Sequence, residues 1–239
     1  MDIESGAPLV GNEPTKYLAQ AEQSVRQGFI KKVYNIIAVQ LLVTSAISFL
    51  IYQQGLPWLQ SNPWIPLVGV IGSLAIILVL SCNPEAARKY PGNYGWLTAF
   101  TLCESLAVGF ITSQYQVESV VLAFGLTGVL FVSLTFLAVT IKIDMTGWLP
   151  YLSMFLLGLV FTSILTMFVP IPQIDSIIAG SCAVVMGLFI VADTQMIVGG
   201  KNDQSFTYSI DDYVFAAIAI YLDIINLFIK LLQIFGKRR

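Results

Sequence analysis

Residues 213–235 read YVFAAIAIYLDIINLFIKLLQIF, and only Asp223 and Lys230 in this stretch are acidic or basic. A helix needs about 20 mainly apolar residues to cross the hydrocarbon core of a bilayer. The stretch is long enough, is hydrophobic on nearly all sides, and lacks the alternating pattern of a barrel strand of about ten residues. It therefore predicts a membrane-spanning helix.

Six runs of similar length and composition precede this stretch. They occupy residues 33–52, 64–82, 95–113, 119–141, 147–169 and 176–198. Turn-forming residues such as Asn83-Pro84 and Gly199-Gly200 separate them. Only 11% of the 239 residues are charged and 56% are hydrophobic. Soluble domains carry about 25% charged residues, so lipid must cover much of this surface. The predicted fold class is all-α integral membrane, a bundle of seven transmembrane helices.

Residues 1–25 differ from the rest of the chain in composition. They are mostly polar, acidic at the start, and interrupted by glycine and proline. They have neither the apolar core of a signal peptide nor the arginines of a transit peptide. We expect a mobile cytosolic tail at 1–25, followed by one membrane domain at 26–239.

Lysine and arginine occur in alternate connections between the predicted helices. They are absent from the loops at 53–63, 114–118 and 170–175. The connections that carry them, including the one before the first run, contain Arg26, Lys31, Lys32, Arg88, Lys89, Lys142 and Lys201. Because cytosolic loops are enriched in both residues, this alternation predicts a cytosolic N-terminus.

The end of the chain breaks the alternation. Lys237, Arg238 and Arg239 follow the last run, on the side that should lack basic residues. Either residues 213–235 span the membrane and violate the charge rule, or they re-enter and return the end to the cytosol. The length of the run favours a full span.

The composition excludes several functional classes. The chain has no histidine, which removes Ser-His-Asp and Cys-His catalysis and zinc sites of the usual type. Its three cysteines show no CxxC spacing. The net charge of −2 leaves no basic face for nucleic acid. We expect a protein that is not an enzyme, has no cofactor, and has the lipid bilayer as its main partner.

Two carboxyl groups inside the apolar runs are expected to meet. Asp193 lies about seven residues, or roughly 10 Å, from the cytosolic end of its helix. Asp223 lies about ten residues, or roughly 15 Å, from the same end of the next helix. Two carboxylates in contact cannot both ionise cheaply, so they would share a proton and respond to pH. Their oxygen atoms also suit a hard cation, which makes both residues candidate Ca²⁺ ligands.

Arg88 is the expected third member of this pH sensor and gate. It ends the second run on the side where Asp193 lies, so a latch between the two is predicted. Lys89 is adjacent and is the alternative latch.

Two further polar residues are candidates for an ion pathway. Asn226 belongs to a stripe along the last run that should face the bundle centre, formed by Ala216, Ala219, Asp223, Asn226 and Lys230. Glu104 lies in the middle of the third run, where an interhelical hydrogen bond is the alternative. Lys230, nearer the far end, is expected to extend to the interface.

Several motifs resemble the transmembrane Bax inhibitor motif family, and its Lifeguard branch in particular. YLDIINLF at residues 221–228 resembles the C-terminal signature of the family, and RQGFIKKVY at 26–34 resembles the segment that leads into the first helix. ESLAVG at 104–109 and ADTQ at 192–195 are also similar. The similarity covers about residues 20–236.

The resemblance implies a seven-helix bundle with the last helix central. It also implies a proton-regulated calcium leak and a cytoprotective, anti-apoptotic role on an endomembrane such as the endoplasmic reticulum, Golgi or vacuole. In that family paired aspartates of the last two helices form the pH sensor, which matches Asp193 and Asp223 here. An arginine at the end of the second helix latches one of them, and both Arg88 and Lys89 lie near the matching place.

Three other functions are alternatives to a channel. An intramembrane aspartyl protease needs Gly-x-Gly-Asp, but Ile190-Val191-Ala192 precedes Asp193. A retinal protein needs an aspartate four residues before the lysine of its last helix, and Asn226 stands there. The serious alternative is a non-transporting scaffold that binds cell-death regulatory membrane proteins.

Overall fold

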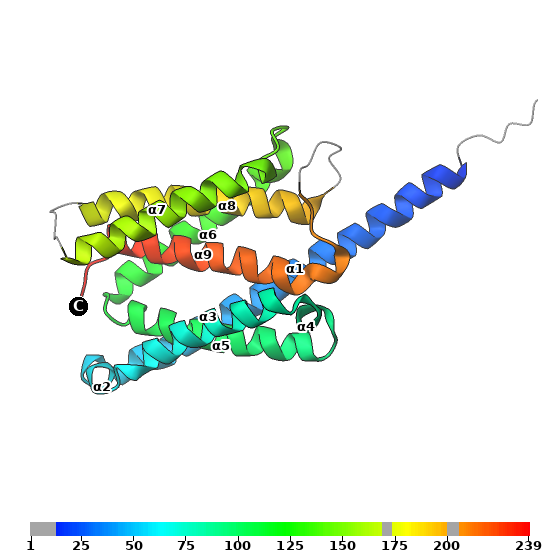
Figure 1. Cartoon of the computed structure of the whole chain (residues 1–239). Coiled ribbons are helices and arrows are strands. Elements are labelled where there is room, and N and C mark those ends of the chain that lie inside the picture. Colours follow the sequence, from blue (N-terminus) through cyan, green and yellow to red (C-terminus); the bar gives the residue numbers. More distant parts are fainter. Residues whose placement is uncertain (1–12, 169–173, 200–205) are drawn as a thin grey trace, which may run out of the picture.

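Seven long helices form the part of the molecule that the structure describes. The structure is a computed structural model that describes residues 13–168, 174–199 and 206–239 (Figure 1). The long helices are α1 (Glu13–Gln54), α3 (Trp64–Cys82), α5 (Gly92–Thr112), α6 (Val117–Thr140), α7 (Leu149–Phe168), α8 (Ile174–Val198) and α9 (Tyr213–Phe235). The short elements are α2 (Leu56–Ser61), α4 (Pro84–Arg88) and the 3-10 turns η1 (Thr146–Trp148) and η2 (Ile210–Asp212). Seven helices are long and apolar enough to cross a membrane. The predicted all-α, seven-helix membrane fold is confirmed.

Proline and glycine end the helices where the sequence indicated. The backbone N–H of Asn83 bonds the Val79 carbonyl and closes α3, and Pro84 then begins α4. Gly55 and Gly199 follow α1 and α8 with φ of 80° and 60°. Only glycine adopts this left-handed conformation without a steric penalty, so both residues allow the chain to turn sharply.

The first helix begins earlier than predicted. Residues 13–25, assigned to a tail, continue α1, which projects beyond the other helices at its N-terminal end (Figure 1). A helix pairs its own backbone groups, so a polar composition alone does not exclude one. Residues 1–12 lie outside the described residues.

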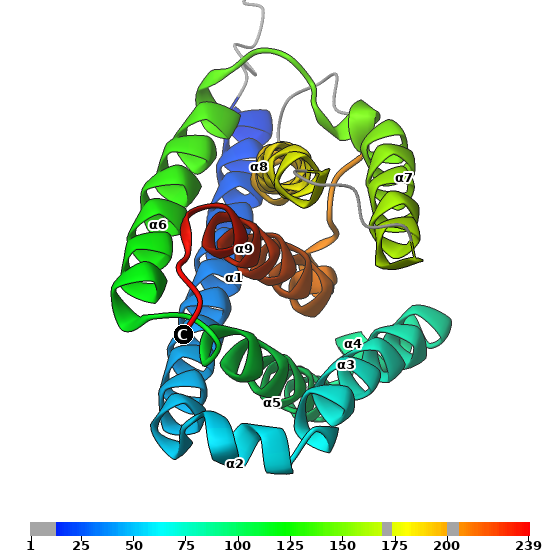
Figure 2. The ribbon, with the colours of Figure 1, turned by 90° about the vertical axis from the view of Figure 1, so that its left-hand side faces the viewer.

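The last helix is the most enclosed of the seven. In α9, 67% of the most apolar 18-residue stretch is buried, whereas only 6% of the corresponding stretch of α7 is buried. Helices α8, α6, α1 and α5 pack against α9, as Figure 2 shows. The outer helix α7 packs against α8 and η1. Side chains on α9 are therefore shielded from lipid on most sides.

Helices α3 and α5 approach each other closely through glycine. A Cβ added to Gly69 would lie 2.7 Å from the Cys103 carbonyl oxygen and 2.9 Å from the Ala107 nitrogen. A side chain at position 69 would therefore force the two backbones apart. This is the small-residue packing expected between helices in a membrane.

Basic residues lie at both ends of the bundle, in the first half of α1 and in the connections between helices at one end and in Lys237, Arg238 and Arg239 at the other. We call the end that carries Arg26, Lys31, Lys32, Arg88 and Lys89 the basic end. The opposite end, formed by residues 53–63, 113–118 and 236–239, is called the far end. Lys201 and most of the 170–175 loop lie outside the described residues.

The C-terminus lies at the far end. Gln116 N–H donates to the Lys237 carbonyl at 2.9 Å, and Arg239 N–H donates to the Gln114 carbonyl at 2.8 Å. The Arg239 guanidinium also stacks 4.6 Å above the Tyr52 ring. Because α9 is one continuous helix that starts at the basic end, residues 213–235 cross the bundle fully, and the re-entrant alternative is wrong.

Candidate functional site

The structure brings Asp193 of α8 and Asp223 of α9 together. Their side chains are 6% and 9% exposed, and the two carboxyl groups lie within hydrogen-bonding contact. The two helices run antiparallel and share a long interface, which places the residues at similar depth. The contact between Asp193 and Asp223 was therefore predicted correctly from their positions along the two helices. Their role in pH sensing stays a prediction.

The surroundings of the pair favour a shared proton. Asp223 Oδ2 is buried and has no N–H or hydroxyl donor among the described residues. The Asp193 carboxyl beside it can donate only when it carries a proton. Two adjacent carboxylates without a cationic partner repel strongly in an apolar interior, so the favoured state holds one proton between them.

Tyr208 lies close to the pair and was not singled out from the sequence. Burial raises the pKa of its hydroxyl above the ordinary value, and the neighbouring Asp193 and Asp223 charges raise it further. The hydroxyl therefore remains protonated and can act as a donor. The Tyr208 backbone N–H is bonded to the Met196 carbonyl at 3.2 Å, which holds the segment before α9 against the end of α8.

Arg26 holds together the chain segments at this end of the site. The sequence did not reveal this role. Its guanidinium donates to the carbonyls of Met196 at 2.6 Å, Val198 at 3.1 Å and Tyr208 at 2.7 Å. These carbonyls include the last ones of α8, which no intrahelical N–H can reach. A Cβ at Gly199 would lie 2.7 Å from the guanidinium, so glycine is needed for the close approach. Arg26 joins α1 to α8 and to the segment that leads into α9.

The predicted latch between Arg88 and Asp193 is wrong. Arg88 Nε instead forms an ion pair with Asp212 Oδ1 at 2.7 Å, just before α9. Helix α4 packs against α5, α9 and η2, so the acidic residue that Arg88 meets is the partly exposed Asp212 at the end of the bundle. The Arg88 side chain is 48% exposed, and the hydrogen bond and charge of Asp212 raise its pKa. Lys89, the alternative latch, is exposed and forms no ion pair in the part of the chain that the structure describes.

Neither candidate for the ion pathway joins the aspartate pair. Glu104 of α5 lies near Ser73 of α3, whose hydroxyl donates to the Val70 carbonyl at 3.1 Å. Asn226 Nδ2 donates to the Leu222 carbonyl of its own helix at 2.9 Å and is half-buried. Lys230 Nζ donates to Gln233 at 3.2 Å in an exposed position.

No cluster of three acidic, cysteine or histidine side chains able to hold a metal ion occurs among the described residues. Calcium prefers six to eight oxygen ligands in proteins. Asp193 and Asp223 can therefore supply only part of a coordination shell, with backbone carbonyls or water for the remainder.

A layer of small polar side chains crosses the middle of the bundle. The Thr44 hydroxyl of α1 bonds the Tyr221 hydroxyl of α9 at 2.8 Å and accepts from Ser105 of α5 at 3.1 Å. The Gln40 amide donates to Thr101 at 2.9 Å one turn closer to the basic end. These bonds fix α1 and α5 against the helix that carries Asp223.

Comparisons with known proteins agree with the motifs in the sequence. The family model described as Inhibitor of apoptosis-promoting Bax1 matches residues 26–239. The chain is 34% identical to Protein lifeguard 3 of Homo sapiens over 224 residues, which covers 91% of this chain and 71% of that protein. It is 32% identical to Bax inhibitor 1 of Schizosaccharomyces pombe over 225 residues, which covers 93% and 81%.

Protein lifeguard 3 of Mus musculus gives the same identity and coverage as the human protein. The resemblance to the Bax inhibitor motif family and its Lifeguard branch is therefore confirmed. This chain is a multi-pass membrane protein and belongs to the Bax inhibitor family.

Proposed function

We propose that this chain is a proton-regulated calcium leak channel of an endomembrane and that it protects cells from apoptosis. The names of the matched family and of the relatives support the anti-apoptotic role. The observation that carries the transport role is the buried contact between Asp193 and Asp223.

The pair can regulate conduction through the contact between α8 and α9. A proton shared between a carboxylic acid and a carboxylate forms a charge-assisted hydrogen bond, which is stronger than a bond between two neutral groups. Acidification adds a second proton and replaces the strong bond with a weaker one. The two helices then separate more easily, so a lower pH favours the conducting state.

Two carboxyl groups are few ligands for calcium, and so few ligands suit passage of the ion rather than tight binding. A permeating ion must bind well enough to enter and weakly enough to leave. Once the helices part, an entering calcium ion displaces the protons, and the two carboxylates then give a site of this kind. Asn226 lies one turn from Asp223 toward the far end and continues the route, whereas Glu104 lies apart, near Ser73 between α3 and α5.

The basic residues support a cytosolic location for the basic end, and hence for the N-terminus. We assign the protein to the endoplasmic reticulum, Golgi or vacuole membrane. Calcium would then flow from the organelle lumen at the far end to the cytosol at the basic end.

A scaffold that binds cell-death regulatory membrane proteins is the second candidate function. It is favoured by the small number of candidate metal ligands in the described part of the chain. It also agrees with the first turns of α1, which project from the bundle (Figure 1).

Calcium flux through liposomes that contain only the purified full-length chain separates the two candidates. We expect release of trapped calcium that rises severalfold when neutral buffer is replaced by mildly acidic buffer. Protein-free liposomes are the control. Flux equal to that control at every pH would contradict the channel and leave the scaffold.

A further inference from the structure

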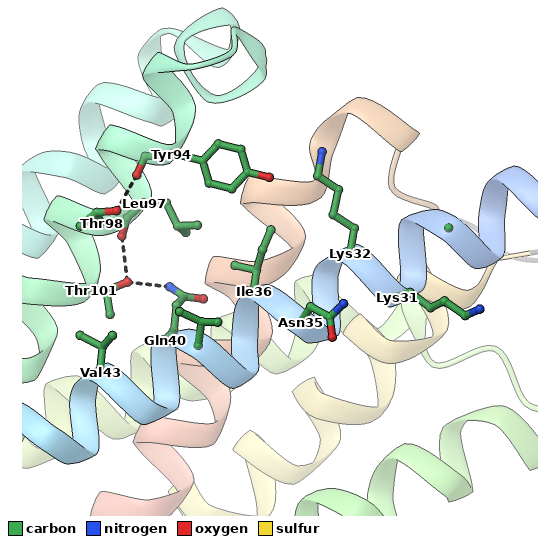
Figure 3. Close-up of a pocket in the computed structure, with 12 residues that line it drawn as sticks. Lys31, Lys32, Asn35, Ile36, Gln40, Val43, Tyr94, Leu97, Thr98 and Thr101 are labelled. Carbon is green, nitrogen blue, oxygen red and sulfur yellow. Dashed lines mark hydrogen bonds between the residues drawn. The ribbon is translucent and has the colours of Figure 1, made fainter.

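A groove of about 580 Å³ lies between α1 and α5 at the basic end (Figure 3). Twelve residues line it, and none belongs to the aspartate site or to its Arg26 and Tyr208 neighbours. Figure 3 shows Lys32 of α1 and Tyr94 of α5 facing each other across its mouth. The groove is a separate feature whose use does not follow from calcium transport.

The mouth of the groove has positive charge without a negative partner. Lys31 and Lys32 both line it, and none of its lining residues is acidic. Neither lysine forms an ion pair with a residue that the structure describes. Lys32 Nζ is held 3.2 Å above the centre of the Tyr213 ring, which fixes its ammonium group at the edge of the groove. An anion is the complementary ligand.

The wall formed by the inner faces of α1 and α5 is mainly apolar, with Ile36 and Leu97, but it contains a buried polar group. Gln40 is 3% exposed, and its amide nitrogen donates to Thr101 Oγ1 at 2.9 Å. Its Oε1 has no hydrogen-bond partner among the described residues. Gln40 lies eight residues from Lys32, or roughly 12 Å along the helix. A groove filled only with hydrocarbon would leave this acceptor unpaired, which favours a polar group or water beside it.

The outer rim of the groove is apolar and faces the bilayer. Val39 lines the groove and is 60% exposed within a helix long enough to span the membrane. Val43 continues the same face one turn further. The occupant must therefore combine an anionic group at the mouth with a hydrocarbon chain along the rim.

We propose that the groove binds an acidic phospholipid from the leaflet at the basic end. The phosphate lies between Lys31 and Lys32, and one acyl chain runs along Val39 and Val43. Water that hydrates the headgroup enters along the inner wall and donates to Gln40 Oε1. Basic pockets between membrane helices bind acidic lipid headgroups in this way.

Lipid retention by the full-length chain in detergent tests the charge requirement. Native mass spectrometry with dioleoylphosphatidylglycerol should show binding about tenfold tighter than with dioleoylphosphatidylcholine, since each lysine near the surface adds appreciable attraction. K31Q/K32Q should lose about this factor, and K31R/K32R should retain it. The matched control, K89Q/K142Q, removes two charges outside the groove and should bind as the wild type does.

A second variant tests the groove itself. Val39→Trp fills the path of the acyl chain and leaves both lysines in place, so it should also weaken phosphatidylglycerol binding about tenfold. Val129→Trp, on an exposed position of α6 outside the groove, is its control and should have no effect. Soluble glycerol 3-phosphate should fail to compete, because it lacks the chain.

Three results would overturn the proposal. Equal loss in K89Q/K142Q would show diffuse attraction to the charged end. Unchanged binding by Val39→Trp would place the lipid outside the groove. Displacement by glycerol 3-phosphate at concentrations similar to the lipid would show a site for soluble phosphates. Each outcome leaves the proposed calcium flux unaffected, because the aspartate pair is not altered.

Discussion

Asparagine in place of Asp193 is expected to make calcium flux the same at neutral and mildly acidic pH. The amide cannot share a titrating proton with Asp223, so acidification can no longer replace an acid–carboxylate bond between α8 and α9 with a weaker one. Flux should therefore lose its rise on acidification. Asp223→Asn should behave alike, and the double variant should add little, because the two residues act as one unit. Calcium release from liposomes at neutral and mildly acidic pH measures the flux of each variant.

Asp175→Asn is the matched control for this prediction. Asp175 lies on the same helix as Asp193 but is exposed near the far end. Its replacement should leave the pH dependence intact. A pH response of normal size in both Asp193→Asn and Asp223→Asn would show that the proton acts elsewhere.

Alanine in place of Arg26 is expected to have the largest effect on stability. It removes three hydrogen bonds from a charged donor to the carbonyls of Met196, Val198 and Tyr208. Bonds to charged groups contribute about 1.5–3 kcal/mol each, and partial exposure reduces this, so we expect a loss of about 2–4 kcal/mol. Denaturant unfolding in detergent measures it.

The loss should be local as well as global. Amide hydrogen exchange should quicken around residues 206–209 and in the last turn of α8, because Arg26 holds them together. Arg26→Lys keeps the charge without the planar fork and should recover only part of the stability. Lys31→Ala, on an exposed position of the same helix, is the control. A similar loss of stability in Lys31→Ala would mean that the effect is not due to the Arg26 contacts.

The helices could be predicted closely because hydrophobic length and turn residues act locally. The runs at 64–82 and 213–235 have the same bounds as α3 and α9. Pro84 and Gly199 mark helix ends that any tertiary fold must respect. The start of α1 was misplaced because a polar helix that extends beyond the membrane has no hydrophobic signal.

Part of the site could also be predicted, because depth along a helix follows from residue number. This placed Asp193 opposite Asp223. It did not place Arg26, whose partners lie 170 to 182 residues away and are backbone atoms that no side-chain pattern reveals. Arg26 therefore looked like a residue that only sets orientation.

The error at Arg88 had a visible cause in the sequence. Asp211 and Asp212 precede Tyr213, at the same end of the bundle as Arg88. A carboxylate at the surface is reached by an exposed arginine more readily than one buried about 10 Å deep, because the buried contact requires desolvation of both groups. Asp212 is therefore the more accessible partner of Arg88.

Infrared spectroscopy of carboxyl groups tests the shared proton between Asp193 and Asp223 most directly. At neutral pH the wild type should show a protonated carboxyl band that grows on mild acidification. Glu104→Gln, which removes a third carboxyl group from the membrane-spanning helices, should retain this band. The double variant D193N/D223N should lose it. Absence of the band from the wild type at neutral pH, or its survival in the double variant, would contradict a proton held between the two aspartates.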